Sequence, residues 1–129
     1  MGKNKNKQQH PLTNASVGAR EGMKMIKDIA FGRFDIYSDG IIFRNRDFLL
    51  AIIREVDIRM MEASIHITAI QYAYSGSTDS NVLRVLHRDR MTYDAYMLIK
   101  QNLMSIYNTG DTGYLHVLAT KLPKYKYNI

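Results

Sequence analysis

The chain has 129 residues and a formal net charge of +6, with 46% hydrophobic and 23% charged residues. This length suits one domain, and the composition is that of a globular protein with a packed core. Because there is no cysteine, disulfide bonds, thiolate nucleophiles and cysteine-ligated zinc are excluded. The longest apolar run, residues 48–53, is far shorter than the roughly 18 residues of a membrane span, so neither a span nor a membrane partner is expected.

The positive charge is concentrated near the two ends of the sequence. Residues 1–20 carry four basic residues and no acid, residues 121–129 carry three lysines and no acid, and the stretch between them is close to neutral. We predict a flexible basic arm over residues 1–13, a single helical domain over residues 14–122, and an extended basic and aromatic tail over residues 123–129.

The first predicted helix begins near Asn14 or Ser16, since either side chain can cap a helix by accepting a hydrogen bond from a free backbone N–H. Apolar residues follow at helical spacing, and Gly32 stands where a left-handed residue ends a helix. Gly18 and Gly22 each weaken this helix by up to about 1 kcal/mol relative to alanine. The helix is therefore expected to need tertiary support.

The apolar period changes over residues 33–44. Phe34 and Ile36 alternate with Asp35 and Tyr37, and Asp39-Gly40 then precedes a second apolar run. An Asp-Gly pair between apolar runs is typical of a tight turn between two strands. This segment predicts a small β-hairpin that lies on the helices or pairs with another chain.

Residues 45–74 carry the strongest pattern in the sequence. Apolar residues recur there at alternating steps of four and three: Leu49, Ile53, Val56, Met60, Ala63, Ile67, Ile70 and Tyr74. The spacing predicts a helix about 40 Å long, at about 1.5 Å per residue, which Gly76 can end.

A second apolar series lies on the far side of the same helix at seven-residue spacing: Ala51, Ile58, Ile65 and Tyr72. One face of a helix cannot bury both series, so this helix is either the centre of a bundle or is covered by a neighbouring subunit. We expect Ile58, Ile65 and Tyr72 to bind a partner subunit. The second half of the helix carries almost no charge apart from His66.

Two more helices are predicted after the loop at residues 75–77. Caps at residues 78–80 begin a short helix, and Thr92 caps the next one. Residues 114–122 fit either a helix or a strand, and Pro123 ends either one. The predicted fold class is mainly α: a small helical bundle around one long central helix, with a minor β-hairpin near residues 33–44 and extended N- and C-terminal arms.

No group of residues predicts catalysis, metal binding or cofactor binding. Glu62 and His66 are four residues apart, as two metal ligands would be, but no further histidine or acid joins them, so a surface ion pair is favoured. His87 and His116 are also isolated, and neither a phosphate-binding glycine loop nor a Gly-x-Ser-x-Gly elbow occurs. Neither a cofactor nor a small-molecule substrate is expected.

Basic residues are candidates for contacts with phosphate or with an acidic partner. Arg84 and Arg88 share a helix face, although a solvated surface is the favoured interpretation. If residues 124–127 are extended, Tyr125 and Tyr127 lie on one side, where they either stack on bases or fill pockets of a neighbouring subunit; the second is slightly favoured. The candidate phosphate contacts are Lys3, Lys5, Lys7, Arg84, Arg88, Lys124 and Lys126.

The predicted function is that of a non-enzymatic structural subunit of a large homo- or hetero-oligomeric assembly, held by helix packing and terminal arms. The small size, the absence of cysteine and the Lys, Asn, Ile and Tyr content favour a bacteriophage virion component, such as a capsid accessory or head–tail connector protein, assembled in the host cytoplasm. The alternative is a nucleic-acid-binding or ribonucleoprotein subunit whose basic arms contact phosphates. A third hypothesis, a small regulatory enzyme, requires a pocket that gathers His66, His87 or His116 with carboxylates.

Overall fold

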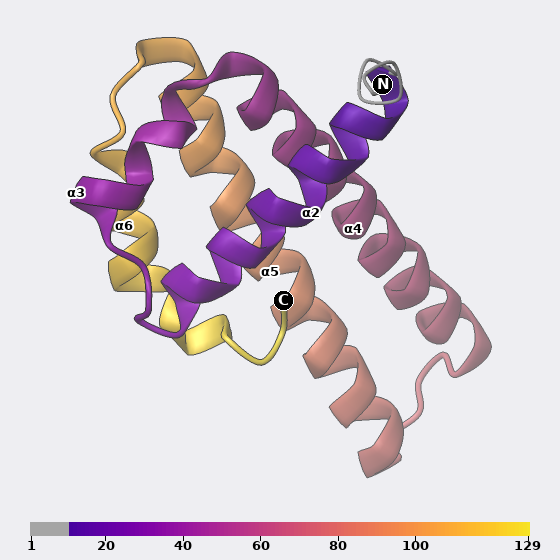
Figure 1. Cartoon of the computed structure of the whole chain (residues 1–129). Coiled ribbons are helices and arrows are strands. Elements are labelled where there is room, and N and C mark those ends of the chain that lie inside the picture. The colour runs from indigo at the N-terminus through magenta and orange to yellow at the C-terminus, as the bar shows by residue number, and fades with distance from the viewer. Residues whose placement is uncertain (1–10) are drawn as a thin grey trace.

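This computed structural model describes residues 11–129, with side chains from residue 18 onward. These residues form five α-helices and two short 3-10 helices, joined by turns and loops (Figure 1). In chain order they are α2 (Pro11–Ala30), α3 (Ile36–Asp39), η1 (Gly40–Arg44), α4 (Arg46–Ala73), α5 (Ser80–Thr109), α6 (Tyr114–Lys121) and η2 (Leu122–Tyr125). The mainly α fold class is confirmed. No strand occurs within these residues, so the predicted β-hairpin is wrong.

The antiparallel pair α4 and α5 forms the largest contact between elements (Figure 1). Helix α4 matches the predicted long helix closely, and its first apolar series is buried as far as Ala63. Polar contacts also join the two helices: Lys100 Nζ lies 2.7 Å from Asp57 Oδ1, and Arg46 donates to the carbonyl of Tyr107 at 2.8 Å. The largest fully buried side chains are Phe43, Ile26, Ile29, Leu49, Ile52, Ile99, Leu103, Ile106, Leu115, Leu118, Leu122 and Val56.

Residues 64–88 form the free end of this helix pair, which we call the α4–α5 extension. Figure 1 shows it projecting beyond α2, α3 and α6. No residue between Ser64 and Arg88 is buried, because of the helices in the described part of the chain only α4 and α5 cover each other there. Ile67, Ile70, Val82, Val85 and Leu86 are half-buried.

Helix α5 is continuous where two helices were predicted. Asp79 caps it by accepting from the backbone N–H groups of Asn81 and Val82. Thr92, the predicted cap of a second helix, instead donates its hydroxyl to the carbonyl of Arg88 at 3.0 Å, one turn earlier in the same helix. A threonine can make this bond inside a helix, and neither glycine nor proline occurs nearby to end the helix.

The predicted β-hairpin is replaced by α3 and η1. Asp35 caps α3 by accepting from the backbone N–H groups of Tyr37 and Ser38, and hydrogen bonds from Ser38 and Tyr37 lower the pKa of its carboxyl group. Gly40 has a helical φ of −70°, so it makes no turn of the type predicted. A Cβ atom on Gly40 would lie 3.1 Å from Leu115. The glycine therefore allows a close approach to α6.

The C-terminal segment is also helical. Residues 114–122, whose sequence fits either a helix or a strand, form α6 and the start of η2, and Leu115 and Leu118 are fully buried. The predicted extended tail at 123–129 is wrong, because Pro123 lies inside η2 and the chain then turns. Tyr125 and Ile129 pack against the core, and this burial opposes an extended conformation.

At the other end, α2 begins at Pro11, so the last three residues of the predicted arm are helical; residues 1–10 lie outside the described part. Gly32, with a φ of 72°, follows α2 as predicted. Gly18 and Gly22, the two glycines predicted to lower the stability of α2, both face α4. A Cβ atom on Gly22 would overlap the side chain of the buried Ile52. Glycine thus lets α2 approach α4 closely.

We predict that Gly22→Ala destabilises the fold by roughly 1–3 kcal/mol, because the added methyl group overpacks the core beside Ile52. Urea unfolding measured by circular dichroism would show the change.

Gly18→Ala is the matched control. A Cβ atom there would lie 3.4 Å from that of Ala51, an ordinary contact, so its gain in helix propensity, up to about 1 kcal/mol, should make it neutral or stabilising. Equal destabilisation by the two substitutions would contradict the close approach at Gly22.

Candidate functional site: a charged groove beside α4

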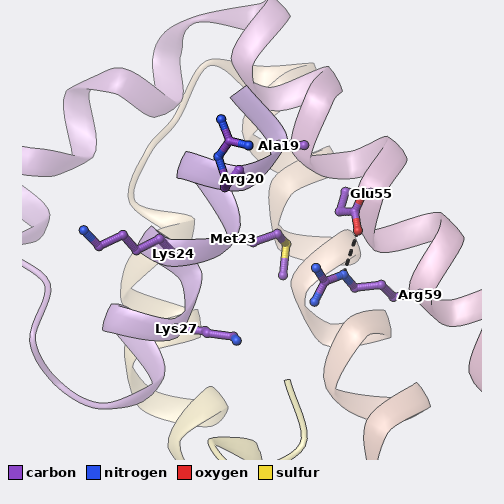
Figure 2. Close-up of a pocket in the computed structure, with 7 residues that line it drawn as sticks. All are labelled: Ala19, Arg20, Met23, Lys24, Lys27, Glu55 and Arg59. Carbon is purple, nitrogen blue, oxygen red and sulfur yellow. Dashed lines mark hydrogen bonds and ion pairs between the residues drawn. The ribbon is translucent and has the colours of Figure 1, made fainter. Parts of the chain in front are cut away.

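Two adjoining hollows lie beside α4 and share Glu55 and Arg59 in their linings. The first, which we call the basic hollow, lies between α2 and α4 and has a volume of about 450 Å³. It is lined by Ala19, Arg20, Met23, Lys24, Lys27, Glu55 and Arg59 (Figure 2). The second, the His66 hollow, lies between α4 and α5, has about 500 Å³, and is lined by Glu55, Arg59, Glu62, Ala63, His66, Asp89, Thr92 and Tyr96.

The lining of the basic hollow contains four cationic side chains and one carboxylate. Arg20, Lys24 and Lys27 follow each other on α2 at steps of four and three, the spacing that places side chains on one face of a helix. Arg59 extends from α4 on the opposite side, and Figure 2 shows Lys27 and Arg59 pointing toward each other across the hollow. The site therefore favours an anion.

Arg59 is held in place by two hydrogen bonds. Its Nε donates to Glu55 Oε2 at 2.8 Å, and its Nη1 donates to the hydroxyl of Tyr96 at 3.1 Å. Partial burial acts to lower the pKa of Arg59, but the hydrogen bonds to Glu55 and Tyr96 outweigh it and raise the pKa above its ordinary value. The guanidinium group thus stays charged and has a defined position between the two hollows.

The His66 hollow contains a buried carboxylate. The Nδ1 atom of His66 lies 2.7 Å from Oδ2 of Asp89, within ion-pair distance, but this buried oxygen accepts no hydrogen bond of good geometry in the described part of the chain. Such a contact is a hydrogen bond only when Nδ1 carries the proton, because two lone pairs would otherwise face each other. The pair therefore joins α4 to α5 at the base of the α4–α5 extension.

This hollow brings His66 together with the carboxylates of Asp89 and Glu62, which is the arrangement that an enzymatic role would require. A nucleophile is the missing element within the lining. Thr92 supplies a hydroxyl group, but that group donates to the carbonyl of Arg88. The other hydroxyl, on Tyr96, accepts a hydrogen bond from Arg59. His87 and His116 do not line this hollow; His116 packs against Tyr37.

The predicted partner-binding residues of α4 lie on its outer surface. Ile58, Ile65 and Tyr72 are all exposed, and Tyr72 is 89% exposed. Other large apolar side chains are exposed on the same helix pair or its loop: Met61, Tyr74 and Leu83. We call Ile58, Met61, Ile65 and Tyr72 the outer face of α4.

The predicted basic and aromatic residues near the C-terminus do not form one alternating strip. Tyr125 packs against the core, whereas Tyr127 is exposed. Lys126 Nζ lies 5.7 Å from the ring centre of Phe31 and 5.3 Å from that of Tyr127, and Lys124 Nζ lies 5.0 Å from the ring of Tyr125. Lys126 and Tyr127 thus lie beside the end of α2.

The other candidate phosphate contacts are dispersed. Arg84 donates to Asn81 at 2.6 Å, and Arg88 Nε lies 3.9 Å from Asp89 Oδ1, so both are engaged along α5. Lys3, Lys5 and Lys7 lie outside the described residues. The basic hollow was not predicted from the sequence, although the spacing of Arg20, Lys24 and Lys27 indicates a basic helix face.

We predict that His66→Ala destabilises the fold by about 1–3 kcal/mol, because it removes the ion-pair partner of the buried Asp89 carboxylate. Chemical unfolding monitored by circular dichroism measures the loss. In an Asp89→Asn background the same substitution should have a much smaller effect. Glu62→Ala, one helical turn away and exposed, is the control and should change stability by less than about 0.5 kcal/mol. An equal loss from His66→Ala in both backgrounds would disprove the coupling.

Neither a membrane-spanning helix nor a clustered metal site occurs in the described part of the chain. None of its helices is both long and apolar enough to cross a bilayer. No three side chains of His, Asp or Glu come together there in a geometry for holding a metal ion. A scan against protein-family models and searches of curated proteins and of solved structures found no match to this chain.

Proposed function

We propose that the chain is a non-enzymatic structural subunit of a larger protein assembly and that the outer face of α4 binds a second copy of the same chain. The observation that carries this proposal is the apolar outer face of α4, which continues along the projecting α4–α5 extension with nothing from the chain's described residues to cover it. Exposed apolar residues in a contiguous group are typical of protein interfaces.

The composition of the extension supports a protein partner. Residues 64–77 contain no Asp, Glu, Lys or Arg, although most of them are exposed. The central part of a protein interface is depleted in charge and enriched in tyrosine and methionine. Ile58, Ile65 and Tyr72 also keep the seven-residue spacing of a helix that packs against another long helix.

The charges beside Ile58 favour a second copy as the partner. Arg54 and Glu62 are both exposed, and each is four residues from Ile58 on α4. If two α4 helices cross in antiparallel orientation at Ile58, Arg54 lies beside Glu62 of the partner subunit, and the symmetric pair forms as well. Such a twofold contact is the commonest arrangement in homo-oligomers.

A role in a bacteriophage virion stays a prediction from composition. In such a component, the outer face of α4 would join neighbouring copies of the chain. The catalytic alternative has weaker support, since both hydroxyl groups in the His66 hollow are engaged in hydrogen bonds.

We predict that the purified chain dimerises with rising concentration and that Ile58→Glu/Ile65→Glu keeps it monomeric, because two buried carboxylates would oppose the apolar contact. Sedimentation equilibrium measures the mass. Ile41→Glu is the control: Ile41 is 65% exposed and Ile65 is 62% exposed, but Ile41 lies in η1. A wild-type chain that stays monomeric at millimolar concentration, or equal dissociation by the control, would disprove the proposal.

The proposed contact between Arg54 and Glu62 of the partner subunit gives an independent check of the antiparallel orientation. Arg54→Glu and Glu62→Arg should each weaken the dimer by placing like charges together, and the double substitution Arg54→Glu/Glu62→Arg should restore it. No restoration would exclude the antiparallel crossing at Ile58.

A further inference from the structure

The basic face of α2 carries charge that the described residues do not neutralise. Arg20, Lys24 and Lys27 are exposed, and none of them forms an ion pair with another described side chain. Like charges three or four residues apart on a helix are destabilising by roughly 0.2–0.5 kcal/mol for each pair. The two acids in the described part of α2, Glu21 and Asp28, do not line the basic hollow, and Asp28 lies 3.7 Å from Arg33. A bound anion would relieve this repulsion.

Arg59 adds a fixed donor on the other side of the hollow. Because Glu55 and Tyr96 hold two of its nitrogen atoms, the guanidinium plane is positioned before any ligand binds. Arginine in a fixed position suits the oxygen atoms of a phosphate, whereas lysine supplies a more mobile point charge. The hollow combines both kinds of group.

The charged row ends on exposed aromatic rings. Phe31, one helical turn after Lys27, lies edge-to-face with Tyr127 at 5.7 Å between ring centres. Arg33 lies 4.8 Å from the centre of the Phe31 ring, and Lys126 contacts both rings. From Arg20 to Phe31 the helix rises by about 16 Å, at about 1.5 Å per residue. This length exceeds that of a single phosphate group.

We propose that α2 binds single-stranded nucleic acid, with the sugar-phosphate backbone along Arg20, Lys24, Lys27 and Arg59 and a base stacked on Tyr127. Rows of cations that follow a backbone and end on exposed aromatic rings are typical of single-strand binding sites. An acidic peptide would match the cations as well, but the exposed ring of Tyr127 beside them favours a base as the stacking partner.

This proposal is independent of the proposed self-association, since it concerns α2 and the C-terminal residues rather than the outer face of α4. It also differs from the predicted contacts at Arg84 and Arg88, which lie on the α4–α5 extension. Substitutions in the basic face of α2 and in the arginines of α5 can therefore be compared for their effects on nucleic-acid binding.

The test is fluorescence anisotropy of a labelled oligothymidine of about 12 nucleotides, titrated with the full chain at several salt concentrations. Arg20→Gln/Lys24→Gln/Lys27→Gln should weaken binding at least tenfold and reduce the salt slope by about 2, at about 0.7 for each lost phosphate contact. Tyr127→Leu should weaken binding roughly tenfold through the loss of stacking, with little change in the salt slope.

The matched control, Arg84→Gln/Arg88→Gln/Arg90→Gln, removes the same charge from α5 and should keep affinity within about threefold of the wild type. A second control, Lys3→Gln/Lys5→Gln/Lys7→Gln, removes the same charge before α2. Circular dichroism verifies that every variant is folded.

Several results would overturn the proposal. These are an equal or larger loss in either control, no salt-dependent binding by the wild type, and equal affinity for a duplex of the same length. If inorganic tripolyphosphate displaces the oligonucleotide at equal phosphate concentration and Tyr127→Leu has no effect, the basic hollow is a simple anion site and the strand proposal is wrong.

Discussion

The packing of α2 against α4 at Gly22 determines where the charged groups of the site meet. Because a side chain on Gly22 would overlap Ile52, the two backbones lie closer together than a larger residue would allow. This approach brings α2 beside Arg59, and Figure 2 shows Lys27 pointing toward Arg59 across the hollow, whereas Lys24 points away from it. Gly22 thus lowers the intrinsic stability of α2 but allows this close approach, and tertiary contacts to α4 compensate for the lost propensity.

The exposed outer face of α4 follows from the lengths of the helices. Helices α4 and α5 have 28 and 30 residues, whereas α2 has 20 and α6 has 8. At about 1.5 Å per residue, α6 spans only about 12 Å of a pair that is more than 40 Å long. The shorter elements therefore cover one end of the pair, and among the described residues the apolar side chains of α4 beyond Ala63 are covered only by α5.

Patterns that extend over many residues predicted the fold well, and short local signals did not. The alternating steps of four and three made α4 predictable almost to the residue. The Asp39-Gly40 pair suggested a turn, but the contact between Gly40 and Leu115 depends on α6, which is distant in sequence. Summing charge along the chain made the middle look neutral and hid the basic hollow, because Arg59 joins Lys27 only after folding.

The two candidate surfaces differ too much in chemistry to bind the same kind of partner. Burying unpaired cations against an apolar surface is unfavourable because the lost hydration is not replaced. The basic hollow thus favours an anionic ligand, while the charge-free extension favours another apolar helix face. Arg59 connects the two regions physically: it borders the basic hollow and donates to Tyr96 of α5. Any change in the spacing of α4 and α5 therefore alters the hydrogen bond that positions Arg59 beside α2.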